Sequence, residues 1–388
     1  MTVQIIIFII SIVAYSYCKD VGSKKDILLQ RKRYITIIMV MFALQSCLRN
    51  VAIGPDTYRY YERFEIARSE SWNALWQNME DYIFLGTEKD PGFDILEKAF
   101  ATLIPNYRFF LIAVAVFFFY SLGKFFYRFA FSNEAVLISV PLYQCIYYNF
   151  FSITGIRQTI ATGILFFAVP LALEKKLLKF LLCVLLAATQ HMTALLFLLL
   201  YPLVFVRNIK MSFIFYSIFF IPMFTIIPLI AEHMVNASVY LNKYSMFVEQ
   251  SEGAGAYALT AYMILANVCV FSVIKRLIFF SNSYYLLINA FALGLLLIPL
   301  TMIDQSNVRL MQYFSIFGLI VFPTSLLLIT NKQINGRISD FSFLIYFIIA
   351  AYTLSKGMDY AFFWQEVPLG DNYEEGGRIV SDFTLNIL

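Results

Sequence analysis

The chain has 388 residues, of which 60% are apolar and only 14% are charged. A soluble domain carries about 45–50% apolar and about 25% charged residues, so the composition excludes an ordinary globular enzyme, a disordered chain and a collagen-like protein. Apolar runs of about 20 residues recur from end to end, which is the length of a helix that crosses a membrane. We therefore predict an all-α, polytopic integral membrane protein.

About twelve transmembrane helices, some of them short or re-entrant, fit these runs as a single helical bundle over residues 1–388. The first is expected to be a retained helix and not a cleaved signal peptide, because no basic residues precede its apolar run. The spans are predicted near 1–18, 34–48, 107–123, 135–151, 155–173, 177–190, 192–206, 211–230, 257–274, 283–302, 309–329 and 341–355.

Basic and acidic residues are concentrated on alternate connections between the predicted helices. More than half of the 29 Lys and Arg residues, Lys32 and Lys124 among them, fall on one set, and most of the 25 acidic residues fall on the other. Because basic connections stay in the cytoplasm, this asymmetry predicts that both termini are outside. The acidic tail at about 356–388 then faces outward, either as a solvated end or as a flap over a cavity.

The first outer connection, at about 49–106, is the only long polar segment. Asp56 follows a proline and is placed to start a helix, on which Tyr58 and Tyr61 share one face. The stretch from Asp94 to Leu103 also has helical periodicity. We expect one or two interfacial helices on the outer bilayer surface. The alternative is a solvated loop whose aromatic side chains anchor in the interface.

Arg157 and Gln158 stand at the predicted outer mouth of an apolar helical hairpin. A guanidinium at this depth costs a few kcal/mol and requires an anionic partner. No acidic residue lies close to Arg157 in the sequence. Its partner is therefore a carboxylate from a distant segment, an anionic ligand held by the guanidinium fork, or the lipid headgroups.

The run from 177 to 206 is either one long helix or two short ones. A single span would invert every later connection and place Arg207 and Lys275 outside, so we predict two short helices. The polar break between them, at Thr189–His191, faces outside. A histidine here is either a hydrogen-bonded packing residue or a group for proton transfer and phosphate binding.

Arg309 belongs to a further polar stretch on the predicted outer side, where an ion pair with Asp304 is the structural alternative to ligand binding. Several ionisable residues thus map to one side under a topology that was derived without them. This pattern predicts an outward-facing cavity that holds an anion beside a carboxylate. The residues are Asp56, Asp90, Arg157, His191 and Arg309.

The sequence has no phosphate-binding glycine loop and no HExxH element, and its five cysteines stand singly. We therefore expect no metal, no nucleotide cofactor and no nucleic-acid partner.

Four short blocks, taken in order, resemble the EpsG family of bacterial polysaccharide polymerases, which belongs with the Wzy-type O-antigen polymerases. Asp90 stands where that family usually has Glu, and Phe93 where it often has Tyr. The blocks are Gly54–Tyr61, Asp90–Leu96, Thr154–Ala161 and Ala187–Ala194.

The resemblance implies a GT-C-like membrane glycosyltransferase at the outer face of the bacterial plasma membrane. Such an enzyme transfers a growing glycan from undecaprenyl pyrophosphate to another lipid-linked repeat unit, without a metal or a nucleotide sugar. Its partners would be that lipid-linked oligosaccharide, membrane lipid, a chain-length regulator and a flippase. The alternatives are a transporter or flippase of lipid-linked oligosaccharide and an O-antigen ligase-like transferase.

Roles for individual residues follow from this chemistry as expectations. The acceptor hydroxyl needs a base, for which Asp56 ranks first, Asp90 second and His191 third. The pyrophosphate leaving group needs fixed cations and hydrogen-bond donors, which Arg157, Arg309 and Gln158 would supply. The candidate sugar-binding residues are Tyr58, Arg59 and Tyr61.

Overall fold

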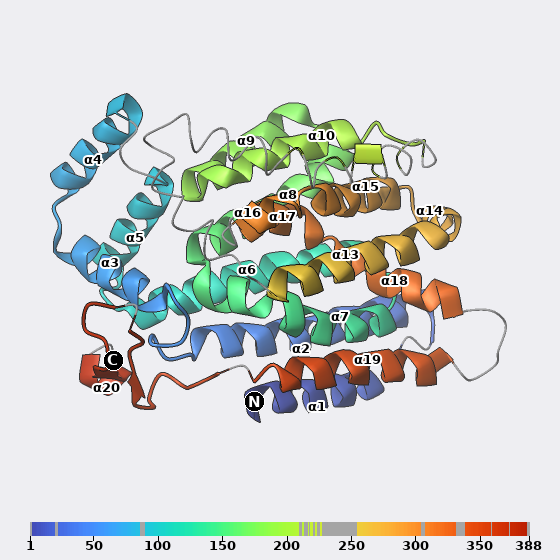
Figure 1. The fold of residues 1–388 in the computed structure, drawn as a ribbon, viewed down its shortest axis with the longest axis horizontal. Helices are drawn as coiled ribbons and strands as arrows, with labels where there is room; N and C mark the ends of the chain where they lie inside the picture. The colour runs from blue at the N-terminus through green and yellow to red at the C-terminus, as the bar shows by residue number, and fades with distance from the viewer. Residues whose placement is uncertain are drawn as a thin grey trace. The chain divides into compact units, whose positions relative to one another are not determined.

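The computed structural model describes residues 2–19, 22–85, 90–208, 254–303, 307–330, 338–357, 359–371 and 373–385, with a few single positions between 212 and 226. This part is almost entirely helical, which confirms the predicted all-α class (Figure 1). The span predicted near 211–230 lies largely outside the described residues.

The chain divides into two compact units. The first comprises Met1–Pro170, Leu178–Leu195 and Phe343–Leu388, and the second comprises Leu171–Leu177 and Leu196–Ser342. The second unit contains α10 (Leu200–Leu203), α13 (Ala254–Ser272), α14 (Ile274–Phe280), α15 (Ser283–Leu296), α16 (Leu300–Ile303), α17 (Val308–Ser315) and α18 (Gly318–Thr330).

The first unit carries most of the candidate site residues. Its helices α1, α2 and α19 run side by side, and Tyr346 of α19 donates its hydroxyl to the carbonyl of Phe8 in α1 at 2.9 Å (Figure 1). The elements in or entering this unit are α1 (Thr2–Tyr17), α2 (Lys24–Cys47), α3 (Thr57–Ser69), α4 (Trp72–Leu85), α5 (Pro91–Leu103), α6 (Tyr107–Phe129), α7 (Asn133–Ile146), the π-helix η1 (Tyr148–Thr154), α8 (Ile156–Leu173), α9 (Leu177–Gln190), the 3-10 helix η2 (Met192–Leu199), α19 (Ile338–Ser355), β1 (Val367–Pro368), β2 (Ile379–Val380) and α20 (Asp382–Leu385).

Helix α2 begins well before the apolar run that predicted it. Ser23 is its N-cap and accepts a hydrogen bond from the Asp26 N–H, while the Asp26 carboxylate accepts one from the Ser23 N–H. This capping box satisfies two backbone donors that a helix start leaves open. The helix therefore extends over Lys24–Arg33, whose charges kept those residues out of the predicted span.

Several helices are long and apolar enough to cross a membrane, as expected for a membrane protein. Within the described residues, α6 and α8 each qualify alone. Three further pairs qualify together, each bent at a short break: α7 with η1 by 67°, α13 with α14 by 68°, and α17 with α18 by 52°. Of the shorter apolar helices, α9 ends at Gln190 and η2 begins at Met192. The predicted break near His191 is confirmed.

The connection at about 49–106 folds into three helices, α3, α4 and α5, where one or two were expected. The predicted helical stretches after Asp56 and from Asp94 both lie within them.

The C-terminal segment is packed against the start of this connection, while its acidic residues Asp371, Glu374 and Glu375 are exposed. The Phe363 N–H donates to the Leu48 carbonyl at 2.9 Å, and the Asn50 N–H donates to the Ala361 carbonyl at 2.8 Å. The buried residue Asp382 anchors this segment. This carboxylate accepts from Nε and Nη2 of Arg108 at 3.0 and 2.6 Å, and both side chains are almost fully buried.

Candidate functional site

Asp90 occupies a costly backbone conformation at the entrance to α5. Its φ of 60° and ψ of 54° are left-handed, a region that non-glycine residues rarely adopt. Pro91 follows as the first residue of α5, where its missing N–H costs nothing. Asp90 holds the N-cap position, but its side chain makes no capping bond to the helix. The carboxylate is turned away from α5 toward other segments.

Three donors converge on the Asp90 carboxylate. Oδ1 accepts the Met192 backbone N–H at 2.8 Å, and Oδ2 accepts Nη1 of Arg157 at 3.0 Å and lies 3.3 Å from Nδ1 of His191. Burial alone would raise the pKa of Asp90, but these hydrogen bonds outweigh burial and hold the pKa below its ordinary value. Asp90 is therefore an ionised, buried acceptor that ties together three segments of the chain.

Gly92 allows these segments to meet. A Cβ at this position would collide with the side chain of Thr189 and would lie 2.7 Å from Nε2 of Gln190. Both residues belong to the last turn of α9. Because any side chain here would separate α5 from α9, glycine is required for the approach of His191 to Asp90.

Arg157 is the second residue of α8 and follows the π-helix η1 and Gly155. A Cβ on Gly155 would lie 2.6 Å from the Phe150 ring, so glycine permits the tight exit from η1. Single π-helical turns are often found at functional sites. The Arg157 guanidinium lies over two aromatic rings, 5.7 Å from the centre of Tyr60 and 5.4 Å from that of Phe93.

The guanidinium of Arg157 is only partly used. Nη1 donates to Asp90, whereas Nε is buried and has no acceptor among the described residues. The side chain is 22% exposed, so it remains reachable from outside the protein. Arg157 is thus a positioned cation with N–H groups left for a ligand.

His191 is held in one tautomer by the ionised carboxylate of Asp90. A carboxylate only accepts hydrogen bonds, so Nδ1 must carry the proton that is donated to Oδ2. In the tautomer that donates from Nδ1, Nε2 is an acceptor, and it has no hydrogen-bond partner among the described residues. The geometry leaves Nε2 available to receive a proton.

A second set of charges continues along the same face of α5. Asp94 pairs with Arg63 of α3, and Oε2 of Glu97 lies 3.8 Å from Nε of the same arginine. The Arg63 guanidinium lies 5.8 Å from the centre of the Phe93 ring, which also contacts Arg157. Burial raises the pKa of Glu97 to about 8, although the neighbouring arginines oppose the shift. Glu97 therefore binds its proton more tightly than an exposed glutamate does.

Substituting Glu97 with Gln is expected to remove a pH dependence of stability. The pKa of Glu97 is raised from 4.5 to about 8 on folding. Protonated Glu97 therefore stabilises the folded protein fully below pH 4.5. This stabilisation, on the order of a few kcal/mol, is lost as the pH rises through about 8. Thermal unfolding of purified wild type should show a falling midpoint between pH 5 and 9, and E97Q should show a flatter curve. The same slope in both proteins would contradict this assignment.

The two predicted tyrosines contact the C-terminal segment, and a different tyrosine, Tyr60, contacts Arg157. The Tyr58 ring packs edge-on against Tyr373, and the Tyr61 hydroxyl donates to the Leu385 carbonyl at 3.5 Å. Both therefore serve the packing of the C-terminal segment. Arg59 is exposed on α3, and Tyr60 is the tyrosine that contacts Arg157. Helical periodicity alone could not indicate which face of α3 turns toward the site.

The remaining predicted residues are Asp56, Gln158 and Arg309. Asp56 is half-buried at the N-cap of α3 and makes no side-chain capping bond. Gln158 is buried next to Arg157. Arg309 is half-buried in α17 of the second unit, and Asp304 lies outside the described residues. The structure thus brings together Asp90, Arg157 and His191 of the predicted set.

Comparison with known proteins identifies the family of this chain. The model of the EpsG family matches residues 32–365, which is most of the chain and includes all four sequence blocks. The chain belongs to the EpsG family. The predicted resemblance is confirmed, and the EpsG family includes Wzy-type polymerases. This EpsG family member is a polysaccharide polymerase-like membrane protein. No curated protein and no solved structure matches the chain.

Proposed function

We propose that this protein is a membrane glycosyltransferase that joins undecaprenyl-pyrophosphate-linked repeat units into a polysaccharide at the outer face of the bacterial plasma membrane. The observation that carries the proposal is that Asp90 binds both Arg157 and His191, while Nε of Arg157 and Nε2 of His191 have no partner among the described residues. Family membership supplies the class of substrate.

In the proposed reaction, a hydroxyl oxygen of the acceptor sugar attacks the anomeric carbon of the donor glycan. The bond from that carbon to the pyrophosphate oxygen breaks, and its electron pair leaves with the pyrophosphate. Arg157 stabilises the negative charge that develops there, because Asp90 already holds the guanidinium in place and its Nε has no acceptor among the described residues. Arg309 of the second unit stays a proposed phosphate-binding residue.

The proton of the attacking hydroxyl passes to Nε2 of His191. Asp90 positions the ring by accepting from Nδ1 and stabilises the imidazolium that forms, as a carboxylate does beside a catalytic histidine. Asp90 itself is a poor base, because its three hydrogen bonds favour the ionised form. Asp56 is kept as the second candidate base, ahead of Asp90.

The test is chain growth by the purified protein alone. Lipid-linked single repeat units would be extracted from host cells that lack this protein, and mixed with the wild-type protein in nanodiscs. A polymerase is expected to produce a ladder of longer lipid-linked glycans. A folded protein that moves a labelled repeat unit between leaflets without lengthening it would instead be a transporter, and the proposal would be wrong.

A further inference from the structure

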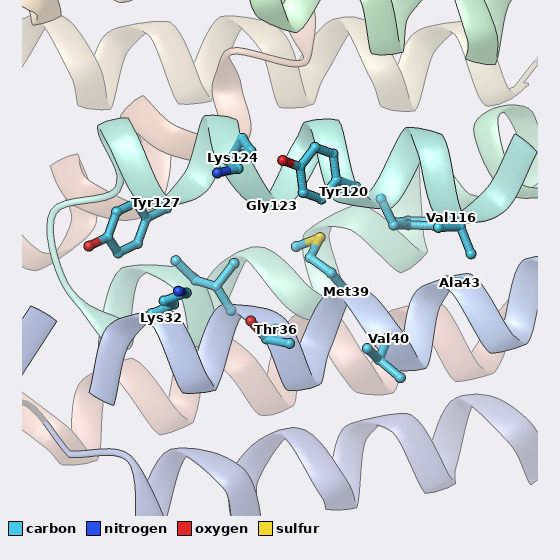
Figure 2. Close-up of a pocket in the computed structure, with 12 residues that line it drawn as sticks. Lys32, Thr36, Met39, Val40, Ala43, Val116, Tyr120, Gly123, Lys124 and Tyr127 are labelled. Atoms are coloured by element: carbon cyan, nitrogen blue, oxygen red, sulfur yellow. The ribbon is translucent and has the colours of Figure 1, made fainter. Parts of the chain in front are cut away.

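A groove runs between α2 and α6 of the first unit, away from the Asp90 site. Figure 2 shows its lining side chains on the two facing helices. The groove has a volume of about 500 Å³. Its floor is made of buried apolar side chains, and its walls include exposed ones. The floor residues are Ile35, Met39 and Phe119, and the exposed wall residues include Val40, Val116, Tyr120 and Tyr127.

The two ends of the groove differ in chemistry. Lys32 and Lys124 lie toward one end, near Tyr127, whereas Ala43 and Val116 lie toward the other (Figure 2). No acidic residue lines the groove, and among the described residues neither lysine is paired with a carboxylate. The Lys124 ammonium lies 5.4 Å from the centre of the Tyr120 ring, so it is held beside the groove. The site therefore offers two cations at one end of an apolar channel.

This arrangement matches an amphiphile with a phosphate at one end and a hydrocarbon chain behind it. Helix α6 is long and apolar enough to cross a membrane, so the exposed apolar walls of the groove meet lipid. Basic pockets between transmembrane helices on the cytoplasmic side bind anionic headgroups. The charge distribution predicts that the lysine end faces the cytoplasm, where anionic lipids are enriched.

We infer that the groove is a binding site for an anionic phospholipid of the cytoplasmic leaflet. The lipid phosphate lies between Lys32 and Lys124, and one acyl chain runs along the groove toward Ala43 and Val116. The inference does not depend on the proposed polymerase activity, because the groove shares no residue with the Asp90 site.

Lipid titration of the purified protein, followed by native mass spectrometry, tests the inference. Phosphatidylglycerol and phosphatidylcholine with identical acyl chains would be compared. Wild type is expected to prefer phosphatidylglycerol by roughly tenfold or more, since each lysine contributes attraction to an anionic headgroup. The K32Q/K124Q double variant should lose this preference. Both lysines are exposed, so their replacement should leave folding intact.

Two further variants separate the groove from general surface charge. Lys179 is an exposed lysine of α9 outside the groove, and K179Q should keep the wild-type preference. A43F would fill the apolar end and should weaken the binding of both lipids. An unchanged preference in K32Q/K124Q, or undiminished binding in A43F, would overturn the inference. Displacement of phosphatidylglycerol by a lower concentration of undecaprenyl phosphate would also overturn it, and would assign the groove to the carrier lipid.

Discussion

Replacing Arg157 with alanine is expected to abolish polymer while lipid-linked single repeat units accumulate. The guanidinium has a buried Nε–H without an acceptor among the described residues, and we propose that it stabilises the charge on the leaving pyrophosphate. Loss of such a preorganised donor costs about 10²–10³-fold in rate. Chain growth would be followed with lipid-linked repeat units and purified variant, and polymer length would be measured on the cell surface.

Two variants make this result interpretable. R157K keeps the charge near Asp90 but cannot form a forked contact, so its rate should fall between wild type and R157A. Arg68 of α3 forms an exposed ion pair with Glu65 at 2.9 Å, and R68A should retain normal activity as a matched control. Normal chain length from well-expressed, folded R157A would exclude the pyrophosphate role.

Replacing Asp382 with asparagine is expected to destabilise the first unit by about 3–5 kcal/mol, because it leaves the buried Arg108 guanidinium without its countercharge. Arg108 also donates through Nη1 to the carbonyls of Cys47 and Arg49, both at 2.8 Å. The C-terminal segment should therefore detach as the C-terminal end of α2 loosens. Thermal unfolding of the purified protein and protease susceptibility of residues 359–385 would report both effects.

The matched control is Glu375, whose ion pair with Arg378 lies on the same segment but is about half exposed. E375Q should unfold at the wild-type temperature. The double variant R108M/D382L should recover part of the lost stability, since an apolar pair can replace a buried ion pair. Recovery would be incomplete because two carbonyls lose their donor. Wild-type stability of D382N would contradict the role assigned to this pair.

The helices were predictable from the sequence because apolar runs and membrane thickness constrain them together. The bend after α7 was not predictable from the sequence. A period of 3.6 residues carries no sign of the wider turn of η1, so residues 135–151 read as one span. Gly155 was the available signal, since its position before Arg157 marks the end of that turn.

The parts of the candidate site were visible in the sequence, but their connections were not. Arg157 stood out because a buried guanidinium requires an anion, and His191 because it interrupts an apolar run. Their shared partner lies 67 and 101 positions away, and no local pattern links residues at such distances. Glu97 was hidden among the many charges of the connection at about 49–106, where only its burial distinguishes it.

The Arg108–Asp382 pair also has a consequence for biosynthesis. Its two residues are separated by 274 positions, and a nascent chain emerges from its N-terminal end. Arg108 is therefore made long before its carboxylate partner, and the C-terminal end of α2 gains this contact only after Asp382 has been synthesised. A chain cut before Asp382 would keep the helices of this unit but lack the ion pair that joins its N-terminal and C-terminal segments.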